Sequence, residues 1–114
     1  MSALIGLASR PCSPAQPGSA PLSDDEAEAL IEALGREWSI TSERRLARHF
    51  SFDDFKRALA FANAVGAEAE SVGHHPDLLI AWGRCEVTLW THDIGGIAEA
   101  DFVLAARIER LYRG

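Results

Sequence analysis

The stretch DLLIAWGRCEVTLWTH, residues 77–92, contains the pattern that decides the fold. Two apolar runs, DLLIAW and CEVTLWTH, flank Gly83-Arg84, and a glycine in the first position of a two-residue connection is typical of a type II′ β-hairpin. Side chains of a strand alternate between the two faces of the sheet. The stretch therefore predicts an antiparallel hairpin with one core face, made of Leu78, Ile80, Trp82, Cys85, Val87 and Leu89.

The same register makes a prediction about two histidines. With Gly83-Arg84 as the loop, His75 lies opposite His92, and directly opposed residues have Cβ atoms about 4.5 to 5.5 Å apart. His74, the neighbour of His75, should point to the other face, toward the helices. The hairpin therefore predicts a site that combines histidines from two distant parts of the chain.

Further elements follow outward from this hairpin. Ser23 and Glu26 have the spacing of a capping box, and Gly35 closes the helix that they begin. WSIT and RLARHFSF read as two short strands, and a longer helix follows with Ser51 or Asp53 as its cap. A last helix runs from about residue 98 to 112. The predicted order is helix, strand, strand, helix, strand, strand, helix.

Composition limits the function. The 114 residues carry a net charge of −6, and their 11 basic residues are scattered, so nucleic acid is not an expected partner. No apolar run reaches the roughly 18 residues that cross a membrane. Cys12 and Cys85 lack metal-ligand spacing and fit a reducing compartment, so we expect the cytoplasm.

The N-terminal residues differ from the rest in composition. MSALIGLA is apolar, but no basic residue precedes it, so it is a weak signal peptide. SRPCSPAQPGSAPL is rich in proline, serine and alanine and cannot bury enough apolar surface to order itself. We therefore predict a flexible tail over residues 1–22 and one domain over residues 23–114.

Titratable side chains gather around the hairpin: Glu70, His74, His75, His92 and Asp101. Histidine has an unperturbed pKa of about 6.5 and can donate or accept a proton near neutrality. Each residue also has a simpler interpretation, because single histidines are usually solvated or satisfied in a core, and Asp101 could serve only the helix dipole. A zinc site is disfavoured, since adjacent histidines lack the spacing of a metalloprotease helix or a zinc finger. General acid–base chemistry without a metal is the favoured function.

These residues resemble the motif of the pterin-4a-carbinolamine dehydratases. The family pattern consists of an acidic residue, a histidine pair before proline, an aromatic residue, a further histidine and an aspartate. This sequence matches the pattern without insertion, at Glu70, His74, His75, Pro76, Trp82, His92 and Asp101. The resemblance extends through EWSI, FSFDDFKRALAF and FVLAARIERL, and so covers nearly all of residues 23–114.

The resemblance implies an α+β fold, in which three helices pack on one face of a four-stranded antiparallel sheet. It implies loss of water from 4a-hydroxytetrahydropterin to give quinonoid dihydropterin, without a metal or an organic cofactor. The substrate is formed by an aromatic amino acid hydroxylase, which is a possible partner, and the family forms homodimers and homotetramers. The same fold also serves as a non-catalytic binding module, as a dimerisation cofactor of a transcription factor or an assembly chaperone.

The resemblance also implies roles for single residues. It makes His74 and His92 the proton donors, His75 a residue that orients the pterin, and Asp101 the hydrogen-bond partner of an imidazole. Glu70 orders the histidine loop, and Trp38 borders the pterin.

Two positions depart from the usual pattern. Ala98 replaces a hydroxyl residue that would cap the last helix, which should loosen Asp101. Trp90 stands where a small residue is common and should narrow the pocket or make a subunit contact.

Overall fold

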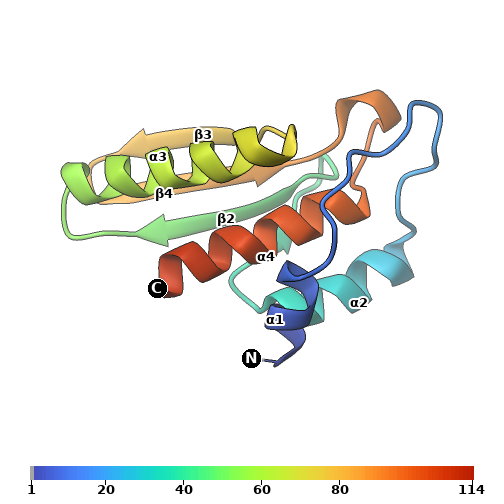
Figure 1. The fold of residues 1–114 in the computed structure, drawn as a ribbon, viewed down its shortest axis with the longest axis horizontal. Helices are drawn as coiled ribbons and strands as arrows, with labels where there is room; N and C mark the ends of the chain where they lie inside the picture. The colour runs from blue at the N-terminus through green and yellow to red at the C-terminus, as the bar shows by residue number, and fades with distance from the viewer. Residues whose placement is uncertain (1) are drawn as a thin grey trace.

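The computed structural model describes residues 2–114, which form one four-stranded antiparallel sheet and four α-helices (Figure 1). The sheet has the order β1-β2-β4-β3. Its strands are β1 (Ser39–Ile40), β2 (Leu46–Ser51), β3 (Asp77–Ala81) and β4 (Arg84–Leu89). The helices are α1 (Ser2–Ala8), α2 (Asp24–Leu34), α3 (Phe55–Val72) and α4 (Glu99–Arg113), and a short 3₁₀ turn, η1 (His92–Ile94), precedes α4. The predicted α+β fold and order of elements are confirmed, with α1 as an additional helix.

One face of the sheet forms the core. Leu46 and Phe50 of β2 and Val87 of β4 are fully buried beneath the helices. His49 and Leu79, which point to the opposite face, remain exposed. The alternation that predicts a core face in the hairpin therefore holds for β2 as well.

Helix ends follow local sequence signals. The Ser23 hydroxyl accepts a hydrogen bond from the Glu26 amide (3.2 Å), and the Glu26 carboxylate accepts one from the Ser23 amide (2.8 Å). These bonds from Ser23 lower the pKa of the Glu26 carboxyl. Asp54 caps α3, one residue beyond the predicted Asp53. Gly73 ends α3 in the left-handed conformation (φ 66°), which turns the chain into the histidine pair.

The hairpin register differs from the prediction by two residues. Ala81 pairs with Arg84 and Leu78 with Val87, so the loop is Trp82-Gly83, with the glycine second (φ 75°). Arg84 belongs to β4 because this strand also pairs with β2, where it lies opposite Ser51. An even shift leaves each strand residue on its predicted face.

This shift has two consequences. Trp82, predicted in the core, lies at the tip of the hairpin and is 74% exposed. His75 and His92 are not paired across the sheet, because β3 begins at Asp77 and β4 ends at Leu89. His92 lies in η1 instead of a strand.

The N-terminal residues include a helix that the prediction of a flexible tail misses. Leu4, Leu7 and Ala8 of α1 are buried in the core. Figure 1 shows α1 beside α2 and α4, and the chain after α1 running back toward the loops that precede α4. The low apolar content that predicts a tail applies to the proline-rich residues after α1 and not to LIGLA.

A buried ionic group joins β2 to α4. Glu109 is 1% exposed, accepts hydrogen bonds from the Trp38 indole (2.8 Å) and the Arg113 guanidinium (2.9 Å), and pairs with Arg48. Burial by itself would raise the pKa of the Glu109 carboxyl, but the bonds from Arg48, Trp38 and Arg113 outweigh it and lower the pKa. The Glu109 carboxylate is thus charged in the core, where it pairs with the Arg48 guanidinium.

Within residues 2–114, no helix has the length and apolar character needed to span a membrane.

Candidate active site

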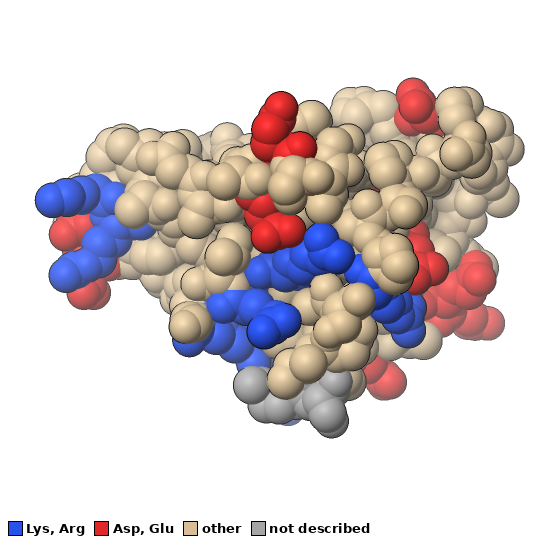
Figure 2. Space-filling view, viewed as in Figure 1, with Lys and Arg blue, Asp and Glu red and all other residues tan. Residues whose placement is uncertain are grey.

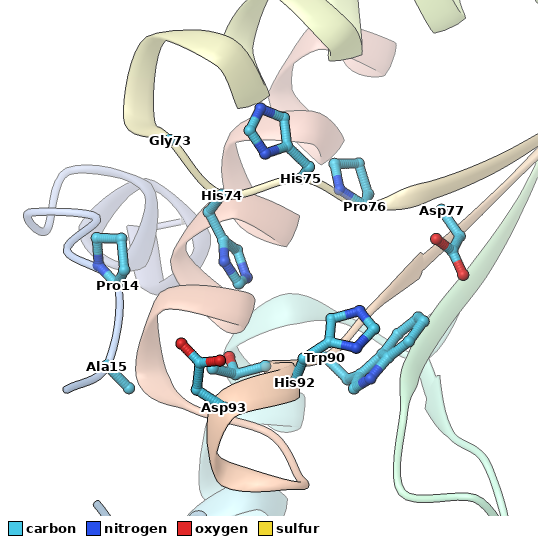
Figure 3. A pocket seen from close by; sticks show the side chains of 11 residues that line it. Pro14, Ala15, Gly73, His74, His75, Pro76, Asp77, Trp90, His92 and Asp93 are labelled. Atoms are coloured by element: carbon cyan, nitrogen blue, oxygen red, sulfur yellow. The ribbon is translucent and has the colours of Figure 1, made fainter. Parts of the chain in front are cut away.

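A cleft of about 420 Å³ opens where the end of α3, the start of β3 and η1 meet (Figure 3). Its walls carry all three histidines of the predicted site: His74, His75 and His92. Gly73 and Pro76 fix the backbone around the first two, since the left-handed glycine ends the helix and proline keeps its predecessor extended. The structure therefore brings the three histidines to one cleft without the predicted strand pairing.

His74 points toward the helices, as predicted, and meets Asp101 in the first turn of α4. Its Nε2 lies 2.5 Å from Asp101 Oδ1. Both side chains are almost entirely buried. A carboxylate only accepts hydrogen bonds, so Nε2 donates here and the orientation of the imidazole is fixed, with Nδ1 as its other nitrogen.

Asp101 is itself held in place by two further donors. The Thr91 hydroxyl donates to Asp101 Oδ2 (2.8 Å), and so does the backbone amide of Ala98 (2.9 Å). Ala98 supplies no capping side chain, but Asp101 caps the amide of Ala98 from the third position of the helix. The loosening of Asp101 expected from Ala98 is therefore not observed.

A small loop, residues 91–96, fixes the position of Thr91. Thr91 forms an isolated bridge with Gly96, and its amide donates to the Gly96 carbonyl (2.8 Å). Gly95 ends η1 in the left-handed conformation (φ 65°), which closes the loop. The loop carries both His92, which lines the cleft, and Thr91, whose hydroxyl bonds Asp101. Thr91 was not among the predicted site residues. A hydroxyl residue directly before the motif histidine was the available signal.

His75 lies at the exposed rim. Its Nε2 is 2.8 Å from a carboxylate oxygen of Glu70, in the last turn of α3, and the two side chains are 62% and 79% exposed. Figure 3 shows the ring of His75 directed away from that of His92. Glu70 thus contacts the histidine loop, as predicted, but only through an exposed ion pair, and such pairs contribute little to stability.

Trp90 contacts His92 on the other side of the cleft. The two ring centroids are 4.3 Å apart, and the planes are tilted by 47° (Figure 3). The guanidinium of Arg45 lies 3.9 Å from the Trp90 ring, a cation–π contact. The bulky residue predicted to narrow the pocket thus forms one of its walls, and Arg45 is a contact that the sequence analysis did not identify.

Trp38 does not line the cleft. It is 3% exposed, packs edge-on against Phe50 and donates to Glu109 in the core. The structure therefore separates Trp38 from the other predicted site residues. Pro14, Ala15 and Asp93 line the cleft instead, and none of them was identified from the sequence.

The side chains of the cleft can donate and accept protons. Across residues 2–114, no group of three histidine, cysteine or carboxylate side chains is placed to hold a metal ion. His74 is oriented by a buried carboxylate, and His92 lines the same cleft in an exposed position. Two imidazoles in these surroundings can supply an acid and a base to a bound molecule.

Comparisons with known proteins identify the family of this chain. The family described as pterin 4 alpha carbinolamine dehydratase matches residues 20–111. Relatives that carry the family's name include one from Alkaliphilus metalliredigens, 44% identical over 91% of this chain and 94% of its own length. Another, from Chlorobium limicola, is 45% identical, and the match covers both chains completely.

Two solved structures have the same fold. A transcriptional coactivator/pterin dehydratase from Brucella melitensis is 30% identical, with a TM-score of 0.76 over 81% of this chain and 98% of its own. A pterin dehydratase-like protein described as a RuBisCO assembly factor in the alpha-carboxysome is 25% identical, with a TM-score of 0.59 over 69% of this chain and 93% of its own. The family match and the full-length relatives lead to one conclusion: this chain belongs to the pterin-4a-carbinolamine dehydratase family.

Proposed function

We propose that this protein is a dehydratase that removes water from 4a-hydroxytetrahydropterin and releases quinonoid dihydropterin. The observation that carries the proposal is the buried pair of His74 and Asp101 in a cleft that His92 also lines. The family match supplies the substrate class.

The reaction needs one proton donor and one proton acceptor. The bond between C4a and the hydroxyl oxygen breaks, and the leaving hydroxide takes a proton from an acid, which makes water. A ring nitrogen loses its proton to a base, and the electron pair of that N–H bond forms the new C=N bond. Proton transfer by positioned side chains contributes about 10² to 10⁴ in rate. Imidazoles suit both tasks near neutral pH.

The site supports a division of labour among the histidines. In our proposal His74 and His92 exchange protons with the hydroxyl and the ring, because Asp101 orients the first and the second is open to the cleft. His75 binds and orients the pterin at the rim. Neither a metal nor an organic cofactor takes part in the proposed reaction.

The direct test is the dehydration of chemically generated 4a-hydroxytetrahydropterin by the purified protein. The absorbance of quinonoid dihydropterin should rise faster than in buffer, in proportion to protein concentration. A rise at the spontaneous rate at every protein concentration would overturn the proposal.

A second candidate is a non-catalytic binding module. It is favoured by the fold shared with the RuBisCO assembly factor and with the protein described as a transcriptional coactivator. A scaffold needs no oriented imidazole and should not speed the dehydration. The same assay therefore separates the two candidates. In the enzymatic case the substrate comes from an aromatic amino acid hydroxylase, and we propose the cytoplasm as the compartment that both share.

We also propose that the protein is a homodimer or homotetramer. Leu79 is 49% exposed on the uncovered face of the sheet, beside Ala81, and a second copy of the chain packed on this face would bury it. Light scattering at micromolar concentration should therefore give a multiple of the 12.4 kDa chain mass, and a monomer would refute this proposal.

A further inference from the structure

The cleft has one wall that lies outside the part of the chain matched by the family. Residues 10–22, here called the N-terminal strap, connect α1 to α2, and the family match begins only at residue 20. Pro14 and Ala15 of the strap line the cleft together with His74 and Asp93. Figure 3 shows the strap passing beside His74, on the side away from Trp90. A bound molecule that reaches His74 therefore also meets the strap.

Contacts with α4 hold the first half of the N-terminal strap. Arg107 donates from Nη2 to the Arg10 carbonyl (2.8 Å) and from Nε to the Ala8 carbonyl (3.0 Å). Arg10 pairs with Glu99 (3.3 Å). Figure 2 shows basic side chains gathered on this face, over α1 and α4. Pro14 and Ala15 therefore follow directly after a fixed segment.

Further contacts hold the strap beside the site. The Cys12 thiol lies 3.5 Å from the Ala100 carbonyl, and only Ser13 and Pro14 separate Cys12 from Ala15. At the other end, the Leu22 amide donates to the Ile97 carbonyl (2.9 Å). Upstream, α1 anchors the strap through buried Leu4 and Leu7.

The hydrogen bonds and the ion pair described above are all made with α4 or with the turn before it. Glu99, Ala100 and Arg107 belong to α4, which also carries Asp101. The wall that carries Ala15 and the carboxylate that orients His74 are therefore positioned by the same element. A wall fixed in this way can select among substrates by size.

We propose that the N-terminal strap is part of the substrate pocket and that Ala15 is a specificity-determining residue, whose small side chain leaves room for the pterin beside His74. The proposal rests on the proposed function, because it takes a pterin as the ligand. Ala15 is half-buried and lines the cleft, whereas Ala20, on the same strap, is exposed and does not. The chain therefore offers a matched pair of alanines.

The test compares Ala15→Phe with Ala20→Phe, with biopterin as the binding probe and 4a-hydroxytetrahydropterin as the substrate. Overfilling a packed site is unfavourable, so Ala15→Phe should raise the biopterin Kd and the KM about tenfold or more. The kcat should stay within about twofold, because binding is weakened in ground and transition states alike. Ala20→Phe should leave all three values unchanged.

A second measurement needs no bulky variant. In wild-type protein labelled at alanine methyl groups, biopterin should shift the NMR signal of Ala15 and leave that of Ala20 in place. Wild-type protein that binds biopterin with an unmoved Ala15 signal and an unchanged Kd in Ala15→Phe would overturn the role of the strap alone. Wild-type protein that neither binds biopterin nor speeds dehydration would overturn the proposed function and, with it, this inference.

Discussion

Asp101 is the residue on which the geometry of the site depends. Its two oxygens accept from His74, Thr91 and the Ala98 amide, and its side chain is fully buried. An asparagine of the same shape would present an NH₂ group where one of these donors now points, which leaves that donor unpaired. Only a carboxylate at position 101 therefore satisfies all three donors at once.

We predict that Asp101→Asn lowers the kcat for dehydration about 10- to 100-fold, the range for carboxylates that orient metal-bound histidines. The KM should change less, because Asp101 acts through His74 and does not line the cleft. Asp25→Asn is the control, since Asp25 is exposed on α2 and does not line the cleft. Equal kcat values for the two variants, measured by the absorbance of the product, would show that Asp101 has no positioning role.

Much of the site was predictable residue by residue, because the motif spans one short stretch of chain. The cleft gathers His74, His75 and His92, with Asp101 and Glu70 behind two of them. The residue type of Trp38 does not show where its side chain lies, because an indole can form a buried hydrogen bond as readily as it can line a pocket. Contacts such as that of Arg45 with Trp90 join distant segments, and sequence spacing does not reveal them.

At the scale of elements, α1 belongs to the folded core. Leu7 is 2% exposed and packs into the core, whereas Ile5 on the same helix is 46% exposed. Leu7→Ala should lower the free energy of unfolding by about 2 to 5 kcal/mol through lost burial and the cavity left behind. Ile5→Ala should change it by less than about 0.5 kcal/mol. Urea unfolding of both variants checks this, and equal midpoints would support the flexible tail instead.

The hairpin shows why faces are easier to predict than register. Alternation of apolar residues assigns Leu78, Ile80, Cys85 and Val87 to the core face in either register. The choice between Gly83-Arg84 and Trp82-Gly83 as the loop depends on where glycine is needed. A positive φ at Gly83 and the bond from the Phe52 amide to the Gly83 carbonyl (2.9 Å) favour the second. Neither feature is visible in the local sequence.

At the scale of the whole molecule, the network around Glu109 makes stability depend on pH. Its folded pKa is lowered, so its contribution to stability is complete above the unfolded value of 4.5 and is lost as the pH falls through the folded value. Glu109→Gln should lower the free energy of unfolding at pH 7 by about 3 to 5 kcal/mol, because it leaves Arg48 buried without its counter-charge.

Acid should then reduce the difference between wild type and Glu109→Gln. Denaturant unfolding at several pH values below 4.5 measures it. Glu28→Gln, on the exposed side of α2, is the control and should follow the wild type throughout. A difference that stays constant down to acid unfolding would show that the charge of Glu109 does not contribute.

The order of elements from α2 to α4 was predictable because most of these elements carry a strong local signal. The capping box at Ser23, the helix ending at Gly73 and the alternating strands define the order of elements. The path of residues 10–22 depends instead on the bond from Arg107 to the Arg10 carbonyl and on the bond from the Leu22 amide to the Ile97 carbonyl. Composition alone does not reveal such partners.

The most direct test of the central claim is the rate of 4a-hydroxytetrahydropterin dehydration with His74→Ala and His92→Ala combined, beside His49→Ala as the control. His49 is exposed on the uncovered face of β2 and does not line the cleft. The double variant should lose about 10²-fold or more of the rate, whereas His49→Ala should keep it. Wild-type activity in the folded double variant would show that His74 and His92 do not carry out the proton transfers.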